Sequence, residues 1–374
     1  MDQILHTPPD ELVAIASKVL GAAATPLGKL SVEKIGHSFG QATVGIYWVT
    51  GRATTSAGEQ LWSAVVKVLG TPAIAVAGLE SDAQREVEVY RAGEFAELCG
   101  GIRAAHCYAI QQRDERQFMW LEDLSQAPQP PWPTEQYIDT AHHLGQFNAH
   151  WPETACPPWE WLNQMQFRDF FKRQPFQGAL ERLADPQSHP QIAQVMPPEV
   201  VAETLQFWHE SERLFEKIAA TPQGICHLDC HPRNLFPKRN CAGDGYTVAI
   251  DWSQVGIGAL GMDVGHLLAD PIKQMILPDE ALRAFTEAVF MAYVDGLTEA
   301  GWSGDLEQIR FAFLTRLGCE ALRNITVAIL SVENPEIRKQ AEKIRKDTSD
   351  KSAARRIDAQ RFFLRFKDEA FQLL

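Results

Sequence analysis

The sequence predicts an α+β fold of two lobes, the first an antiparallel sheet with a helix and the second larger and mainly helical. Strand-like runs gather between residues 30 and 121, whereas helical periodicity dominates from residue 134 onward. The chain has 374 residues, and single hydrophobic cores stop growing at roughly 250–300 residues. Two packed bodies are therefore expected.

The clearest change in composition is the proline-rich stretch 127–133. Since it closely follows the last strand-like run, we place the lobe boundary at about residue 123. Residues 1–123 then form an N-terminal lobe and residues 124–374 a C-terminal lobe.

Composition excludes some classes of protein. With 45% hydrophobic and 22% charged residues, the chain is typical of globular proteins. A formal net charge of -13 disfavours nucleic acid as a partner. It is compatible with a cationic substrate, although solubility explains an acidic surface equally well. No apolar run approaches membrane-spanning length, so no membrane partner is predicted.

Cysteine usage and the first residues bear on the compartment. Seven scattered cysteines fit a reducing environment, and no basic segment leads into an apolar one at the start of the chain. We therefore expect a cytoplasmic protein. The sequence leaves the oligomeric state open.

The elements of the first lobe are predicted from periodicity and punctuation. A helix opens at residues 7–11 with a polar residue, prolines and acids, and it stops at Gly21. Strands are predicted over residues 30–35, 43–50, 61–69, 104–111 and 117–121.

The turn that joins the first two predicted strands has the composition of a phosphate-binding loop. It contains Gly36, Ser38, Phe39 and Gly40, and the backbone N–H groups of such a turn can approach phosphates. The turn lacks G-x-G-x-x-G spacing, however, and an ordinary hairpin explains the same residues.

Lys67 interrupts an otherwise apolar run, residues 64–69. An unpaired buried ammonium is strongly disfavoured, so Lys67 either extends to water from an edge strand or meets an anion. The residues alone leave both interpretations open.

The stretch that carries the chemistry is residues 227–236, followed by an apolar strand that ends at Asp251. Asp229 can accept the proton of an attacking hydroxyl. Asn234 and Asp251 offer hard oxygen ligands for a Mg²⁺ that bridges nucleotide phosphates.

A zinc site is the competing interpretation of the same stretch. Cys226, His227, Cys230 and His231 are all residues of zinc-binding types. Their spacing matches no paired-knuckle pattern, and no second C-x-x-C follows, which disfavours this interpretation.

The pattern H-x-D-x-H-P-x-N, followed by I-D-W, resembles the aminoglycoside phosphotransferase and choline kinase group, including its ecdysteroid-kinase-like relatives. The resemblance covers residues 30–270 and is most specific over residues 227–251. It implies a protein-kinase-like fold. Leu228 stands where protein kinases have Arg, and Trp252 rather than Phe follows Asp251.

The resemblance implies roles for residues of the first lobe. Lys67 would hold the α- and β-phosphates, and an acid on the next helix, residues 81–94, would orient it. Glu86 fits that position, because Glu88 points about 200° away around the helix. Glu122 and Leu124 lie where these kinases bind adenine through backbone groups at the hinge.

The resemblance also extends to the second lobe. Gly145 and Asn148 match the family's L-G-x-x-N helix, which lies under the catalytic loop. Asp263 is a candidate N-cap for its helix and, by resemblance, anchors the catalytic-loop backbone. The aromatic residues of 151–171 would wall the acceptor pocket, although core packing explains most of them. Further helices are predicted over residues 134–150, 279–300, 306–330 and 335–374.

We therefore expect an enzyme that moves the γ-phosphoryl group of ATP, or of another nucleoside triphosphate, to a hydroxyl of a small molecule with Mg²⁺ as cofactor. Amino sugars such as aminoglycosides, choline-like amines and other alcohols remain candidate acceptors. A nucleotide-binding regulatory pseudokinase is disfavoured because no catalytic position is lost. A protein kinase is disfavoured by the absence of H-R-D, D-F-G and A-P-E.

Overall fold

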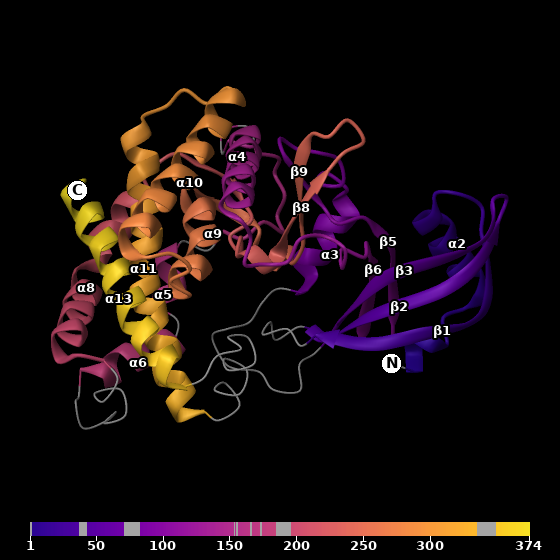
Figure 1. The fold of residues 1–374 in the computed structure, drawn as a ribbon, viewed down its shortest axis with the longest axis horizontal. Coiled ribbons are helices and arrows are strands. Elements are labelled where there is room, and N and C mark those ends of the chain that lie inside the picture. Colours follow the sequence, from indigo (N-terminus) through magenta and orange to yellow (C-terminus); the bar gives the residue numbers. More distant parts are fainter. Residues whose placement is uncertain are drawn as a thin grey trace. The chain divides into compact units, whose positions relative to one another are not determined.

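The computed structural model divides into two compact units (Figure 1). The sheet unit comprises residues 1–98, 103–128 and 248–254, and the helical unit comprises residues 99–102, 129–247 and 255–374. The residues that the structure describes are 2–36, 43–70, 83–152, 154, 156–164, 167–172, 174–184, 196–334 and 349–374. The predicted α+β class and the antiparallel first sheet are confirmed. Ser38, Phe39 and Gly40 lie outside the described residues.

The sheet unit is built on a five-stranded antiparallel sheet with strand order β1-β2-β3-β6-β5. β2 and β3 pair along their whole length. Pairing with β3 carries β2 five residues beyond the expected end, through a segment of small and polar residues, 51–55, whose burial still alternates. The elements are α1 (Asp2–Leu5), α2 (Pro9–Leu20), β1 (Thr25–Gly36), β2 (Thr43–Thr55), β3 (Gly58–Leu69), α3 (Ala83–Ala92), β4 (Ile102–Ala104), β5 (Cys107–Arg113) and β6 (Arg116–Leu121).

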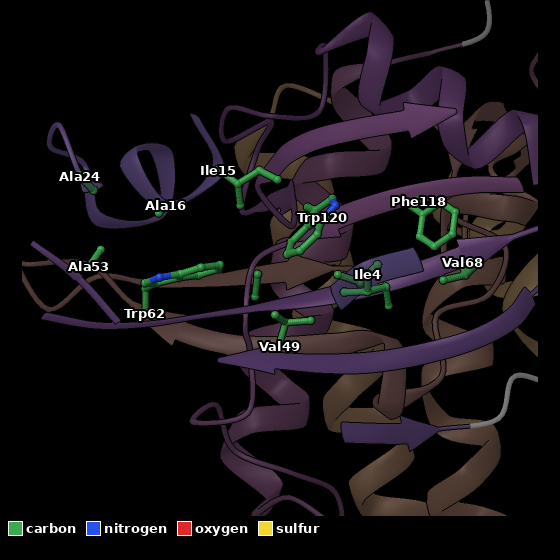
Figure 2. Packing of buried hydrophobic residues seen from close by; sticks show 12 residues of the cluster. Ile4, Ile15, Ala16, Ala24, Val49, Ala53, Trp62, Val68, Phe118 and Trp120 are labelled. Carbon is green, nitrogen blue, oxygen red and sulfur yellow. The ribbon is translucent and has the colours of Figure 1, made fainter. Parts of the chain in front are cut away.

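The two faces of this sheet are covered by different helices. Ile15 of α2 packs with Trp62 and Trp120 on one face, where Figure 2 shows both indole rings beneath the helix. On the other face, Val87 of α3 packs against strands β3 and β6. Because side chains alternate along a strand, Lys67 points to the α3 face, opposite its buried neighbours Val66 and Val68.

The helical unit contains most of the remaining elements (Figure 1). They are α4 (Thr134–His150), α5 (Phe167–Lys172), α6 (Gln174–Leu183), α8 (Pro198–Ile218), β7 (Gln223–Cys226), η2 (Pro232–Asn234), β8 (Leu235–Arg239), β10 (Gly256–Ala259), α9 (Met262–Lys273), α10 (Asp279–Glu299), α11 (Leu306–Glu333) and α13 (Ser349–Gln372). Strand β9 (Gly245–Ala249) begins in this unit, and η3 (Trp252–Gln254) belongs to the sheet unit.

Helices α4 and α10 approach each other through a pair of glycines. A Cβ atom on Gly145 would lie 2.1 Å from the carbonyl oxygen of Tyr293, and one on Gly296 would lie 2.0 Å from that of His142. Neither position has room for a methyl group, since both obstacles are backbone atoms.

We expect Gly145→Ala to lower the free energy of unfolding by about 1–3 kcal/mol, because overpacking outweighs the better helix propensity of alanine. Denaturant unfolding measures the change, and Asp139→Ala on the exposed side of α4 is the control. A Gly145→Ala variant as stable as this control would contradict the close approach.

The C-terminal segment packs as a core element. Phe362, Phe363 and Phe366 of α13 are buried, and basic residues on its other sides pair with acids of α8 and α10. Residues 335–348 of the longer helix that we predict lie outside the described residues. Within the described residues, no helix is long and apolar enough to cross a membrane.

Candidate active site

Two carboxylates of the sheet unit, those of Glu86 and Asp251, pair with the ammonium of Lys67. Its Nζ lies 2.6 Å from Glu86 Oε2 and 3.0 Å from Asp251 Oδ1. The Lys67 and Glu86 side chains are 8% and 1% exposed. Lys67 therefore meets anions in the protein interior, and the edge-strand interpretation is wrong.

Electrostatics keep Lys67 charged at this place. Burial by itself would lower the pKa of the ammonium, but the carboxylates of Asp251 and Glu86 raise that pKa above its ordinary value. A buried ammonium is tolerated here because two acceptors compensate it.

The helix register agrees with the choice of Glu86 over Glu88. Glu88 accepts hydrogen bonds from Gln84 and Arg91 at the surface of α3, whereas Lys67 donates to Glu86. The pairing of Lys67 with Glu86 is thus present in the structure, while its role toward phosphates remains a proposal.

Two contacts that the sequence does not predict join the segment around Asp251 to α3 and to the residues that follow it. Arg85 Nη1 donates to the carbonyl oxygen of Ser253 at 2.6 Å. The rings of Phe95 and Trp252 stack with centroids 4.9 Å apart. Asp251 itself has a φ of 61°, in the left-handed region that non-glycine residues avoid. Such backbone strain persists where the surroundings over-determine it, which is common at functional sites.

The predicted catalytic loop, residues 227–236, follows β7 in the helical unit. Asn234 donates through Nδ2 to the backbone oxygen and to Oδ2 of Asp229, each at 3.0 Å. The amide of Asp229 donates to His227 Nδ1 at 3.2 Å. Leu228 between them has a φ of 62°. The structure therefore brings Asp229 and Asn234 together and orients the asparagine so that Oδ1 is the atom left to ligate a cation.

The side chain of Asp263 anchors the backbone of this loop. Its two carboxylate oxygens accept the backbone N–H groups of His227 and Leu228, each at 2.9 Å. The anchoring expectation is confirmed, but the N-cap expectation is wrong. Gly261 is the N-cap residue of α9, and Asp263 lies inside the first turn, where its fully buried carboxylate reaches the loop instead.

A second layer supports Asp263 from α4 and α10. Asn148 donates to Asp263 Oδ2 at 3.1 Å and to the carbonyl oxygen of Ile225 at 3.0 Å. Tyr293 donates to Asn148 Oδ1 at 2.9 Å. Asn148 belongs to the predicted L-G-x-x-N helix, whereas sequence reasoning missed Tyr293, which no local motif marks.

The predicted hinge residues are fixed in the sheet unit. Arg103 donates to both carboxylate oxygens of Glu122, at 2.7 and 3.1 Å. The backbone amide of Glu122 donates to the carbonyl oxygen of His106. Leu124 is buried. Gly36 ends β1, so of the predicted phosphate turn only this residue is described.

Asn234 offers an amide oxygen and Asp251 a carboxylate, which are hard ligands of the type that Mg²⁺ prefers. Asn234 belongs to the helical unit and Asp251 to the sheet unit. The thiols of Cys226 and Cys230 are fully buried, and burial raises the pKa of each well above its ordinary value.

Several aromatic residues of the predicted acceptor wall contact other aromatic rings of the helical unit. Phe167 stacks edge-on against Phe171 and Phe215, and Trp159 stacks on Trp161. Phe171 and Phe215 are buried, which is typical of core packing, whereas Trp159 and Trp161 are half-buried.

Comparisons with known proteins place this geometry in context. A model of the phosphotransferase enzyme family matches residues 49–304, more than half of the chain. No curated protein matches. The fold is similar to an amicoumacin kinase, hAmiN, solved with AMP-PNP, Ca²⁺ and Ami, at 14% identity and a TM-score of 0.51 over 92% of both chains. It is also similar to an aminoglycoside phosphotransferase from Alicyclobacillus acidocaldarius, at 15% identity and a TM-score of 0.50 over 90% of this chain and 92% of that chain.

Proposed function

Because the chain belongs to the phosphotransferase enzyme family, we propose that it moves the γ-phosphoryl group of a nucleoside triphosphate to a hydroxyl of a small molecule. Membership makes the protein an enzyme, a small-molecule kinase with an alcohol group as acceptor. ATP is the proposed donor and Mg²⁺ the proposed metal.

The contact that best supports this proposal is the buried pair of Lys67 and Glu86, with Asp251 as a second acceptor. A phosphoryl transferase needs a fixed cation for the nucleotide phosphates and a carboxylate for the metal. Lys67 would bind the α- and β-phosphates, and Glu86 would keep it aimed. Backbone groups of Glu122 and Leu124 would bind the adenine.

The proposed reaction is an in-line transfer. Asp229 accepts the proton of the acceptor hydroxyl while that oxygen bonds to the γ-phosphorus. The bond between the γ-phosphorus and the β–γ bridging oxygen breaks, and the nucleoside diphosphate leaves with the electron pair. Asn234 and Asp251 would hold Mg²⁺, which neutralises charge on the phosphates. Asn234 also holds the Asp229 carboxylate through the 3.0 Å contact of its Nδ2.

A screen of small alcohols for ADP release tests the proposal. The library should hold amino sugars, choline-like amines, neutral alcohols and hydroxy acids, each with ATP and Mg²⁺. We expect at least one acceptor to yield a phosphorylated product, detected by mass spectrometry, with loss of activity in EDTA and in Asp251→Ala. A regulatory pseudokinase would instead bind nucleotide and release no ADP with any acceptor.

A further inference from the structure

Beside Asp229, the helical unit gathers an excess of positive charge. Within the described residues, four cations and two carboxylates other than Asp229 form one connected cluster. They are Arg233 of η2, Asp270 and Lys273 of α9, and Arg316, Glu320 and Arg323 of α11. The chain as a whole carries a net charge of -13, so this local sign is opposite to the overall one.

Glu320 cannot compensate all the cations that surround it. Its side chain is 0% exposed and pairs with Lys273 and Arg316 at short range. Arg323 Nη1 lies 3.5 Å from the same carboxylate, which makes it the third cation on one anion. Asp270 pairs with Arg233 at 2.9 Å. Arg323 has the longest ion-pair distance in the cluster, and its side chain is 31% exposed. Burial alone would lower its pKa, but the carboxylates of Glu320, Asp229 and Asp270 keep that pKa above the ordinary value, so it stays charged.

Arg323 is connected to the proposed base through one imidazole ring. Its Nη1 lies 3.2 Å from His266 Nε2, which in turn lies 3.8 Å from Asp229 Oδ1. Since the guanidinium donates to Nε2, the proton of neutral His266 lies on Nδ1. The His266 side chain is 6% exposed, and Nδ1 has no hydrogen-bond partner among the described residues.

The second imidazole beside Asp229, that of His231, also has a ring nitrogen without a partner among the described residues. His231 Nε2 lies 3.7 Å from Asp229 Oδ2, and its buried Nδ1 has no partner among the described residues. Burial lowers the pKa of His231 and of His266, so both rings are neutral at physiological pH. The carboxylate of Asp229 is therefore surrounded by two neutral imidazole rings, and the guanidinium of Arg323 lies beyond one of them.

Two aromatic rings of the predicted acceptor wall, those of Phe167 and Phe170, already face cations of the chain. The guanidinium of Arg316 lies 5.7 Å from the ring centre of Phe167, and that of Arg323 lies 6.0 Å from Phe170. A quaternary ammonium requires such faces for cation–π contact. In this wall they face the chain's own cations.

From this cluster we infer that the acceptor carries an oxyanion, a carboxylate or a phosphate, close to the hydroxyl that is phosphorylated, and that Arg323 binds it. A guanidinium presents paired N–H groups that match an oxyanion. The inference rests on the proposed function and names its substrate class. Cationic aminoglycosides and choline would be repelled at this wall.

A matched series of C6 acceptors tests the inference. Gluconate, glucose 6-phosphate, glucose and glucosamine all have six carbons and several hydroxyl groups and differ in charge. Gluconate carries a carboxylate and glucose 6-phosphate a phosphate, so they separate the two oxyanions. We expect kcat/KM for an anionic member to exceed that for glucose and glucosamine. Arg323→Gln should reduce the ratio of anionic to neutral kcat/KM about tenfold, and Arg323→Lys should restore part of it.

Arg310→Gln is the matched control, because Arg310 lies on the same helix with 33% of its side chain exposed and pairs with Glu287. It should leave the ratio unchanged. A higher kcat/KM for glucosamine, or an anion preference that survives Arg323→Gln, would overturn the inference while leaving the proposed function intact. Absence of Asp229-dependent ADP release with every acceptor of the library would overturn the proposed function instead.

A second measurement does not require turnover. At fixed ionic strength, gluconate or glucose 6-phosphate should raise the thermal midpoint of the wild-type protein more than glucosamine does, and Arg323→Gln should abolish the difference. Equal shifts for anionic and cationic sugars in the wild-type protein would contradict an oxyanion site.

Discussion

Asp229→Asn is expected to lower turnover by about 10²–10⁴-fold while leaving the fold and nucleotide affinity nearly unchanged, since a positioned general base contributes this much. An asparagine at this position retains an oxygen for the amide of Asn234, whose Nδ2 lies 3.0 Å from Oδ2. It cannot accept the proton of a hydroxyl. A loss of turnover without a loss of stability can therefore be assigned to the missing proton acceptor.

The measurement is kcat with the best acceptor of the screen, together with nucleotide affinity and the thermal midpoint. Asp295→Asn, an exposed residue of α10, is the control. Retention of more than about a tenth of wild-type turnover by a folded Asp229→Asn protein would show that another group takes the proton.

The second large effect concerns Lys67 and Glu86. Lys67→Ala and Glu86→Gln should each lower kcat/KM strongly, and the double variant should be little worse than Lys67→Ala. A misdirected ammonium is almost as ineffective as an absent one, so the two losses should not add. Coupling energies between residues in contact are typically about 0.5–3 kcal/mol.

The control cycle pairs Lys67→Ala with Glu88→Gln on the outer side of α3, where losses should add. Thermal midpoints check that each variant folds, because breaking a buried ion pair also costs stability, about 3–5 kcal/mol. Small and additive losses for Lys67 and Glu86 would place nucleotide binding elsewhere in the protein.

Local patterns predicted the strands of the first sheet and several of the helices, and the family resemblance implied the pairing of Lys67 with Glu86. A lysine in an apolar strand needs an anion, and helical periodicity places Glu86 and Glu88 on different sides of α3. The strand lengths were underestimated, because the ends of β1 and β2 are fixed by hydrogen bonds to a neighbour and not by apolar alternation.

Long-range partners could not be predicted from local patterns. Asp263 looked like a cap by composition, but its carboxylate binds amides 35 and 36 residues earlier in the chain. Arg323 lies far along the chain from Asp229 and belongs to a helix that is buried on most of its sides, so no sequence pattern singles it out. Only the packing of α11 against α9 reveals its place near the base.

The contact of Lys67 with Asp251 has a consequence for the order in which charges are exchanged. The carboxylate proposed to ligate Mg²⁺ already has a cation 3.0 Å away, so its charge is compensated within the polypeptide. If Asp251 ligates the metal as proposed, Mg²⁺ would bind a carboxylate that already has a counterion, and the nucleotide phosphates would offer Lys67 a replacement partner. Under this proposal we expect Mg²⁺ to bind more readily together with nucleotide than alone.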